Sequence, residues 1–540
     1  MNKNDTIAWR SLSVRGATLD LLRSLKIDRV FGNPGSTELN FLRDWPDDIP
    51  YILGLQESCV VGMADGYAQA TGNAAFVNLH SAAGVGHALG NLFTAFRNKT
   101  PLVVTAGQQS RSLLPLQPYL YAEQAAEFPK PYVKWSVEPA RPEDVPAAIA
   151  RAYHTAMQHP RGPTFVSVPS DDWSHAALPL PERSVAYEFG PDLDAIARLS
   201  NAIGVSKRPA FVVGPMVDRA HAVDNIVALA ERANAAVWAS PMSSRCSFPE
   251  RHGHFAGFLQ AAPEPLSAAL EPYDLIVVFG APVFTFHVEG HCGVLQDGRK
   301  IWQLTDDPAE AAISHSANSI IGALRPSLAA LLEQLGPSGR PLPAPRVVPP
   351  APGPADPIPG AFALNILSRL LPPGAIVVEE APSHRPAIQR YLPMAGADSF
   401  YTMASGGLGY SLPASVGVAL ARPGRRIVCL VGDGSAMYSI QSLWTAAQHN
   451  LPITFLVLNN AGYGAMRAFS RSMQISAPPG IDLPGIDFVG MATSLGCRAA
   501  RVGAAADLAG QLHEALASDG PFLVDIPVDR GTVQLYGTDH

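Results

Sequence analysis

Two short polar motifs follow apolar runs in the C-terminal third of the chain. Gly432-Asp433-Gly434 follows the run Ile427 to Val431, and Asn459-Asn460 follows the run Ile453 to Leu458. Such runs predict buried strands of a parallel sheet, which binds ligands at the carboxyl ends of its strands. Glycines let backbone N–H groups approach a diphosphate, while Asp433 and Asn460 offer oxygens to a hard cation such as Mg²⁺. The two motifs together predict a diphosphate-containing cofactor held through a metal ion.

Each motif alone has an ordinary structural explanation. Gly-Asp-Gly is a common strand-to-turn sequence, and Asn-Asn is a common loop sequence. Here the two motifs end neighbouring predicted strands, with a spacer of about two dozen residues between them. Their combination favours the cofactor site over two unrelated turns.

Three more polar residues follow apolar runs in the N-terminal third. Ser36 comes after Val30-Phe31 and a Gly-Asn-Pro-Gly turn, Glu57 follows the run that begins at Tyr51, and His80 follows the run Ala75 to Leu79. If these runs are parallel strands, the three side chains meet at one edge of a sheet. A carboxylate held in an apolar crevice there can exchange a proton near neutral pH. We therefore expect an acid–base site at this edge.

Each of these three residues also has a structural alternative. Ser36 precedes Thr37 and Glu38 and could be the N-cap of a helix. Glu57 could be an acid placed in a first helical turn by the helix dipole. His80 could be an ordinary loop or core histidine. Convergence of all three at one sheet edge favours the functional interpretation.

A fourth candidate, His287, follows the predicted strand Leu275 to Phe279 in the segment VFTFHVEGH. His291 lies four residues later, and two histidines at this spacing can bind zinc on a helix. However, no cysteine completes such a site nearby, and Gly290 disfavours a helix. A plain loop histidine and a catalytic histidine remain as the two other interpretations.

Composition bounds the class of protein. The chain has 540 residues, of which 47% are hydrophobic and only 16% charged, below the usual quarter, so much of its surface is expected to be buried between subunits. The net charge of −7 and the absence of a basic cluster argue against nucleic acid as a partner. Five scattered cysteines without CxxC spacing suit a reducing cytosol. Without an N-terminal signal pattern or an apolar run of ~18 residues, we expect a cytoplasmic protein with no membrane partner.

Short apolar runs alternate with helical stretches in three sets, which predicts an α/β protein of three doubly wound parallel-sheet domains. Pro and Gly dominate residues 336–360, which predicts an extended linker. We place the domains at 1–180, 190–335 and 361–540. The predicted strands are Arg29–Phe31, Tyr51–Leu55, Ala75–Leu79, Leu102–Thr105, Thr164–Val168, Ala210–Val213, Val237–Ala239, Leu275–Phe279, Ile301–Gln303, Ile376–Val378, Ile427–Val431, Ile453–Leu458 and Phe522–Ile526.

Nearly the whole chain resembles a known family. The stretches VFGNPGSTEL, LQESCVVGMADGYAQATG, NLHSAAGVGHALGN, LVVTAGQQSR, VSVPSDDW, GAPVF and ASGGLGYSLPA occur in the order typical of thiamine diphosphate (ThDP)-dependent decarboxylases, and more narrowly of benzoylformate decarboxylases. Acetohydroxyacid synthases have a glycine-proline turn where this chain has His80, and pyruvate decarboxylases carry an adjacent His-His pair that is absent here. The resemblance implies an N-terminal pyrimidine-binding domain, a middle domain and a C-terminal diphosphate-binding domain.

The resemblance also implies roles for individual residues. Glu57 would hydrogen-bond the aminopyrimidine and so promote loss of the thiazolium C2 proton, Ser36 would bind the substrate carboxylate, and His80 and His287 would transfer protons. The expected ligands of Mg²⁺, or of Ca²⁺ as a substitute, are Asp433, Asn460 and the carbonyl of Gly462. The expected cofactor-binding residues are Ser383, Gly406, Leu408, Gly432, Gly434, Ser435 and Tyr463.

The implied reaction is the non-oxidative decarboxylation of an aromatic 2-oxo acid, benzoylformate, with carboligation as a side activity. The implied assembly is a homotetramer, a dimer of dimers with active sites at subunit interfaces. Where the family typically has phenylalanine and tryptophan, this chain has Thr402 and Ala468, so another aryl or branched 2-oxo acid is an alternative substrate. The expected pocket residues are Leu114, Tyr119, Leu120, Thr402, Ala465, Met466 and Phe469.

Three other functions remain open on the sequence. A related ThDP oxidase or synthase would bind FAD in the middle domain, and a dinucleotide-dependent dehydrogenase would need a Gly-x-Gly-x-x-Gly turn. The segment FVVGP that ends at Pro215 lacks that fingerprint. A catalytically inactive regulatory subunit would have no reason to retain Glu57, His80, His287 and Asp433.

Overall fold

The structure is a computed structural model that describes residues 12–531, 535 and 536. The chain divides into two compact units. Unit 1 comprises Met1–Tyr187, Ser405–Arg422 and Ser439–His449, and unit 2 comprises Glu188–Ala404, Pro423–Tyr438 and Asn450–His540. Unit 1 contains one six-stranded sheet and unit 2 contains two.

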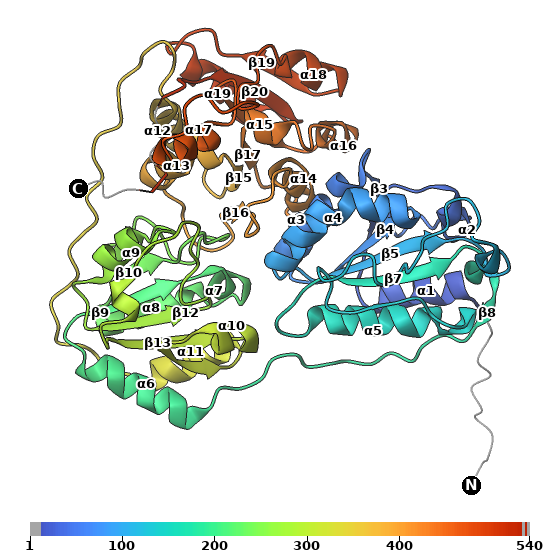
Figure 1. Ribbon diagram of the computed structural model, residues 1–540, viewed down its shortest axis with the longest axis horizontal. Helices are drawn as coiled ribbons and strands as arrows, with labels where there is room; N and C mark the ends of the chain where they lie inside the picture. Colours follow the sequence, from blue (N-terminus) through green and yellow to red (C-terminus); the bar gives the residue numbers. More distant parts are fainter. Residues whose placement is uncertain (1–11, 532–534, 537–540) are drawn as a thin grey trace. The chain divides into compact units, whose positions relative to one another are not determined.

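The sheet of unit 1 is parallel throughout, with the strand order β3-β2-β4-β5-β7-β6. Its strands are β2 (Val30–Gly32), β3 (Tyr51–Leu53), β4 (Ala75–Leu79), β5 (Leu102–Gln108), β6 (Ser136–Val137) and β7 (Thr164–Pro169). Helices α1 (Val14–Ser24) and α5 (Val145–Met157) cover one face, and α3 (Glu57–Thr71) and α4 (Ser81–Arg97) cover the other (Figure 1). Because both faces are covered, β4, β5 and β7 are buried at every residue. A small antiparallel pair, β1 (Leu12–Ser13) and β8 (Ala176–Ala177), completes the strands of this unit.

The first sheet of unit 2 has the order β11-β10-β9-β12-β13-β14 and is also parallel. Helices α6 (Leu193–Val205), α8 (Val223–Ala233) and α11 (Leu324–Gln334) bury their apolar faces in one core on this sheet, and α9 (Pro263–Leu270) contributes to a second core. The strands are β9 (Pro209–Val213), β10 (Ala236–Ala239), β11 (Phe255–Phe258), β12 (Leu275–Phe279), β13 (Lys300–Thr305) and β14 (Ala317–Ile321), and the short helices are α7 (Pro215–Arg219) and α10 (Pro308–Ile313).

The second sheet of unit 2 has the order β16-β15-β17-β18-β20-β19, again parallel. Its core includes residues of α12 (Gly360–Leu370) and α19 (Leu508–Ala517). The strands are β15 (Ile376–Glu380), β16 (Phe400–Thr402), β17 (Ile427–Gly432), β18 (Ile453–Asn459), β19 (Arg498–Arg501) and β20 (Phe522–Pro527), and the remaining helices are α13 (Arg385–Tyr391), α15 (Asp433–Ala436), α17 (Gly464–Ser472) and α18 (Phe488–Ser494).

Three parallel-sheet domains are therefore present, as the sequence predicts. All of the predicted strands occur, with ends that differ by up to three residues. The strands that the sequence did not predict are β1, β6, β8, β11, β14, β16 and β19. Residues 335–359 contain no helix and no strand of a sheet, apart from an isolated bridge between Ile358 and Val528. The boundaries of the three domains stay a prediction.

Two helices within the third predicted domain, residues 361–540, belong to unit 1. These are α14 (Ser411–Ala421) and α16 (Ser442–Gln448). Helix α14 crosses α3 closely because glycines line the contact: a Cβ on Gly417 would lie 1.9 Å from the carbonyl oxygen of Met63, and one on Gly66 would lie 2.3 Å from that of Ala414. Any larger side chain at Gly417 or Gly66 would push the two helices apart.

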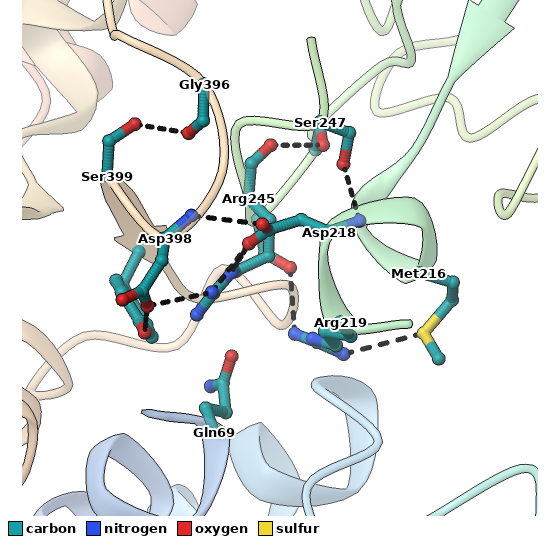
Figure 2. A network of polar contacts seen from close by, with 12 residues as sticks. Gln69, Met216, Asp218, Arg219, Arg245, Ser247, Gly396, Asp398 and Ser399 are labelled. Atoms are coloured by element: carbon teal, nitrogen blue, oxygen red, sulfur yellow. Dashed lines mark hydrogen bonds and ion pairs between the residues drawn. The ribbon is translucent and has the colours of Figure 1, made fainter. Parts of the chain in front are cut away.

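A buried ion network joins the two sheets of unit 2 (Figure 2). The guanidinium of Arg245 donates to Asp218 at 2.6 Å, and its centre lies 3.5 Å from the ring centroid of Tyr401. Asp218 also accepts the backbone N–H of Asp398 at 3.0 Å. Both Arg245 and Asp218 have side chains only 3% exposed. Because an unpaired charge in such a place is strongly unfavourable, this network ties the position of one sheet to the other.

Candidate active site

Ser36, Glu57 and His80 stand beyond the carboxyl ends of β2, β3 and β4, which are neighbours in the sheet of unit 1. Ser36 begins the short helix η1 (Ser36–Glu38), whose N-cap is Gly35, so the structure does not make Ser36 an N-cap. Glu57 is the first residue of α3, and the side chain of Gln56 caps that helix by accepting from the N–H of Cys59. His80 occupies the N-cap position of α4. The sheet edge therefore presents all three predicted residues.

The imidazole of His80 is held by a buried carboxylate. Its Nδ1 lies 2.9 Å from Oε2 of Glu38 and 3.0 Å from Oγ1 of Thr37. The hydrogen bond to Glu38 raises the pKa of His80 above its usual value, and partial burial opposes that effect. The His80 side chain stays 19% exposed, whereas that of Glu38 is 1% exposed. The Glu38 carboxylate thus orients the His80 imidazole through Nδ1.

Glu38 is itself fixed by four hydrogen bonds. Oε2 accepts from the N–H of Gly35 at 2.8 Å as well as contacting His80, and Oε1 accepts from the N–H of Gly107 at 2.9 Å and from Thr37 Oγ1 at 2.6 Å. Gly35 and Gly107 leave room for this arrangement: a Cβ on Gly35 would lie 2.3 Å from Nδ1 of His80, and one on Gly107 would lie 2.1 Å from Oε1 of Glu38. Sequence reasoning treated Glu38 only as a neighbour of Ser36. The Gly-Ser-Thr-Glu sequence carried the signal, since Glu38 stands three residues after the N-cap Gly35, the position from which a capping-box acid reaches the N–H of the N-cap.

Glu57 contacts an exposed histidine in unit 1. Its Oε2 lies 3.1 Å from Nδ1 of His87, a side chain that is 64% exposed, while Glu57 itself is 13% exposed. Gly406 and Leu408 belong to the same unit, in the loop before α14. That loop is tied to α4, which carries His87, by a hydrogen bond of 2.8 Å between Ser405 and Thr94.

The predicted metal ligands are gathered in unit 2. Asp433 follows β17, and Asn460 follows the neighbouring strand β18. Oδ2 of Asp433 accepts the backbone N–H of Gly462 at 2.7 Å, which brings the third predicted ligand to the same place. Burial raises the pKa of Asp433 above its usual range, and hydrogen bonds from backbone N–H groups oppose the rise. A bound cation would offset the unfavourable burial of this carboxylate.

A hard cation fits this group of ligands. Asn460 is 5% exposed, and its Oδ1 is buried without a hydrogen-bond partner among the described residues. A buried amide oxygen without a partner is unfavourable by about 1–3 kcal/mol, so a cation bound by this oxygen would stabilise the fold. One carboxylate, one amide oxygen and one backbone carbonyl form an oxygen ligand set that suits Mg²⁺ or Ca²⁺. In the described part of the chain, no group of three His, Cys, Asp or Glu side chains could hold a metal ion.

The predicted diphosphate-binding residues lie around these ligands. A Cβ on Gly464 would lie 2.6 Å from Nδ2 of Asn460 and 2.8 Å from Oγ of Ser383, so Ser383 and Asn460 flank one small space. A Cβ on Gly434 would lie 2.5 Å from the ring of Tyr463. Gly432 ends β17, and Ser435 is a buried residue of α15. The structure thus places Ser383, Gly432, Gly434, Ser435 and Tyr463 around the proposed metal ligands.

His287 lies in an irregular segment after β12, not on a helix, and its backbone N–H donates to the carbonyl of Ala261 at 2.8 Å. Its ring makes an edge contact with Phe469 of α17, with 5.1 Å between centroids. Its Nδ1 lies 2.7 Å from the hydroxyl of Tyr536. The contact with α17 brings His287 to the helix that directly follows Gly462 and Tyr463. Sequence reasoning missed Tyr536, which lies in a segment without strand or helix periodicity.

The predicted pocket residues fall into two groups. Leu114, Tyr119 and Leu120 belong to unit 1, where Tyr119 is 89% exposed and the carbonyl of Leu120 accepts from Ser81 at 2.8 Å. The other group belongs to unit 2 and comprises Thr402, Ala465, Met466 and Phe469.

Thr402 differs from the others because it is fully buried. Its hydroxyl donates to the carbonyl of Glu379 at 2.7 Å and accepts from Arg385 at 3.0 Å. Arg385 forms an ion pair with the Glu379 carboxylate. In this arrangement Thr402 positions Arg385 and presents no accessible surface of its own.

Family models match most of the chain. The thiamine pyrophosphate enzyme N-terminal TPP binding domain matches residues 13–126, the central domain of the same enzymes matches residues 196–331, and their C-terminal TPP binding domain matches residues 381–526. These three segments contain Ser36, Glu57 and His80, then His287, and then the predicted metal ligands. Among the described helices, none is both long and apolar enough to span a bilayer.

Individual relatives match along almost their full length. The chain is 43% identical to benzoylformate decarboxylase of Pseudomonas aeruginosa over 95% of this chain and 98% of that protein. It superimposes with a TM-score of 0.93 on the crystal structure of benzoylformate decarboxylase from Polynucleobacter necessarius, at 39% identity over 96% of this chain and 99% of that one. The TM-score is 0.92 for the ThDP-dependent 4-hydroxybenzoylformate decarboxylase of Rhodococcus jostii RHA1, at 41% identity over 96% and 99% of the two chains. The chain therefore belongs to the thiamine pyrophosphate enzymes, as a decarboxylase closely related to benzoylformate decarboxylase.

Proposed function

We propose that this decarboxylase acts on aromatic 2-oxo acids, with benzoylformate as the preferred substrate and benzaldehyde and CO₂ as products. The observation that carries the proposal is the pair of Glu38 and His80 at the sheet edge that also carries Ser36 and Glu57. A carboxylate-bound imidazole with a raised pKa can hold a proton near neutral pH and deliver it from Nε2. A proton delivered in this way converts the decarboxylated substrate to the aldehyde.

The other residues at this edge receive complementary roles. Ser36 is exposed and its hydroxyl can donate to a substrate carboxylate. Glu57 can exchange a proton with the aminopyrimidine ring, since in unit 1 it is only 13% exposed and its contact with the exposed ring of His87 is weak. ThDP, when bound, supplies a thiazolium ring that accepts the electron pair released with CO₂.

We assign the diphosphate and its Mg²⁺ to the group around Asp433, Asn460 and Gly462. The unpartnered oxygen of Asn460 supports this assignment. Ca²⁺, which accepts the same oxygen ligands, is the expected substitute.

The aromatic character of the substrate is supported by two observations. Phe469 of α17 and His287 pack in an edge-to-face arrangement, which is a favourable geometry for a further aromatic ring as well. The three relatives described above carry benzoylformate or 4-hydroxybenzoylformate in their names. We propose Leu114, Tyr119, Leu120, Ala465, Met466 and Phe469 as substrate-contacting residues, and Thr402 as a support for Arg385.

The test is a panel of 2-oxo acids assayed with ThDP and Mg²⁺, in which CO₂ release and the aldehyde are both measured. We expect the largest kcat/KM for benzoylformate, followed by 4-hydroxybenzoylformate, with pyruvate and 3-methyl-2-oxobutanoate well below. A higher kcat/KM for pyruvate or the branched acid would refute the aromatic assignment. A flavin absorbance spectrum of the purified protein would instead favour the related oxidases and synthases.

Carboligation and assembly are proposed on the same basis. With acetaldehyde added as acceptor, benzoylformate should yield a 2-hydroxy ketone detectable by chiral chromatography. We propose a cytoplasmic homotetramer, a dimer of dimers with active sites at subunit interfaces. Light scattering should give four times the 57.2 kDa chain mass, and a monomeric mass would overturn this assembly.

A further inference from the structure

The end of the described chain contacts a predicted catalytic histidine. The hydroxyl of Tyr536 lies 2.7 Å from Nδ1 of His287, and the two rings are nearly perpendicular, at 87°. Phe469 touches both rings, with centroids 5.1 Å from His287 and 6.2 Å from Tyr536. Three rings from widely separated segments of unit 2 therefore form one cluster, which we call the ring cluster.

The hydrogen bond to Tyr536 restricts the orientation and the tautomer of the His287 imidazole. The two ring nitrogens of an imidazole point in different directions, so a partner on Nδ1 leaves Nε2 for other contacts and fixes the plane of the ring. A phenol that donates to Nδ1 makes Nε2 the protonated nitrogen of a neutral imidazole. Burial raises the pKa of Tyr536, so the phenol keeps its proton in the neutral pH range and remains able to donate.

The surroundings of Tyr536 favour this direction of donation. The positive charge of Arg385 acts on the Tyr536 phenol. A guanidinium has donors and no acceptors, so it cannot accept the phenol proton, whereas Nδ1 of His287 lies within hydrogen-bond distance of the hydroxyl. Arg385 is in turn held by Glu379 and Thr402.

We propose that Tyr536 is a positioning residue that holds His287 as the neutral tautomer with its proton on Nε2, ready to donate a hydrogen bond to an oxygen of the reacting substrate. This inference rests on the proposed function, because it takes His287 as a residue of the catalytic site. Phe469 supports the same ring from the side, so the hydroxyl sets the tautomer and the two aromatic rings set the orientation.

The test compares two Tyr→Phe variants, each of which removes one hydroxyl and keeps the ring. Tyr536→Phe breaks the bond to His287. Tyr187→Phe is the matched control, because its hydroxyl lies 2.6 Å from Nδ1 of His154, a residue of α5, which covers the face of the unit 1 sheet opposite α3 and α4 (Figure 1). Loss of one neutral hydrogen bond corresponds to roughly a five- to tenfold change in rate.

We expect Tyr536→Phe to lower kcat for benzoylformate about tenfold with a much smaller change in KM, and to alter the pH profile of kcat, whereas Tyr187→Phe leaves kcat unchanged. A second readout does not depend on activity: diethyl pyrocarbonate labelling followed by mass spectrometry. Labelling should accelerate at His287 in Tyr536→Phe and at His154 in Tyr187→Phe, since each ring loses its Nδ1 partner.

Two outcomes would overturn the proposal. Unchanged labelling at His287 would show that the bond does not form, and faster labelling with an unchanged kcat would reduce it to a structural contact. A wild-type protein that releases no CO₂ from any 2-oxo acid would be a failure of the proposed function, which the labelling experiment separates from a failure of the Tyr536–His287 contact.

Discussion

Replacement of Glu38 by glutamine tests the acid–base pair most directly. The carboxylate accepts two hydrogen bonds at each oxygen, whereas the side-chain amide in Glu38→Gln would have one oxygen and one –NH₂ group. Whichever way the amide is turned, the –NH₂ faces the backbone N–H of Gly35 or of Gly107, and one of these donors loses its acceptor. An unsatisfied buried donor costs about 1–3 kcal/mol, and loss of a hydrogen bond to a charged group adds about 1.5–3 kcal/mol. We expect Glu38→Gln to destabilise the protein by about 2.5–6 kcal/mol.

The sign of the pH effect follows from the pKa of His80. Because Glu38 raises that pKa, its removal lowers it, and the protonated imidazole is lost at lower pH. If the protonated form delivers the proton, kcat falls as pH rises, and this descending limb should move to lower pH in Glu38→Gln. Above the new pKa, the loss is bounded by the about 10²- to 10⁴-fold that a positioned acid contributes.

The pH dependence of the free energy of unfolding checks independently that Glu38 raises the pKa of His80. A raised folded-state pKa contributes stability that is fully present below the unfolded value of about 6.5 and disappears as pH rises through the folded value. The difference in stability between wild type and Glu38→Gln should therefore be larger at about pH 6 than at about pH 8.5. Urea denaturation at several pH values measures it.

Thr37→Val is the matched control for this experiment. It removes a hydroxyl that contacts both Glu38 and His80 but leaves the carboxylate in place. We expect some loss of stability and a much smaller displacement of the pH limb. If the limb in Glu38→Gln stays where it is in wild type, or moves to higher pH, the assignment of His80 as a carboxylate-assisted proton donor is refuted.

Three further predictions concern other parts of the molecule. Glu57→Gln should lower kcat by about 10²-fold or more while thermal stability changes little, because Glu57 has only a weak contact with the exposed His87; near-normal turnover would argue against its role. Chelation with EDTA should abolish reconstitution of the apo-protein with ThDP. Asp433→Asn should raise the Mg²⁺ concentration needed for half-maximal activity. Reconstitution that is unaffected by EDTA would exclude a metal ion from the cofactor site. Asp218→Asn should destabilise unit 2 by up to about 3–5 kcal/mol, because the buried Arg245 loses the nearer of its two carboxylate partners and keeps only Asp398, at 3.6 Å; a urea midpoint equal to that of wild type would contradict the importance of this network.

The sequence was most informative for the central strands. Strands such as β12 and β17 are buried along almost their whole length, so their sequences are nearly continuous apolar runs. The strands that escaped prediction include β11, β14, β16 and β19 at the edges of the two sheets of unit 2 and β6 at an edge of the sheet of unit 1. Strand β14 is mostly exposed and β19 is intermediate or exposed at every residue, so neither carries a continuous apolar signal.

For the candidate site too, the sequence predicts some features and the tertiary structure supplies the others. The positions of Ser36, Glu57, His80, Asp433 and Asn460 follow from strands that end where polar residues begin, which is local information. Sheet order then decides which strand ends are neighbours, and only the tertiary structure supplies it.

Partners that are distant in sequence were beyond prediction from the chain alone. Glu38 accepts from Gly107, which lies 69 residues away, and Tyr536 meets His287 across 249 residues. No local periodicity encodes such contacts, because each depends on how complete strands and helices pack. The sequence by itself therefore determined the fold class and the cofactor, thiamine diphosphate, and it proposed the candidate residues of the site. The tertiary structure decided which carboxylate and which phenol orient the two histidines, since orientation depends on hydrogen bonds that form only after the sheets are assembled.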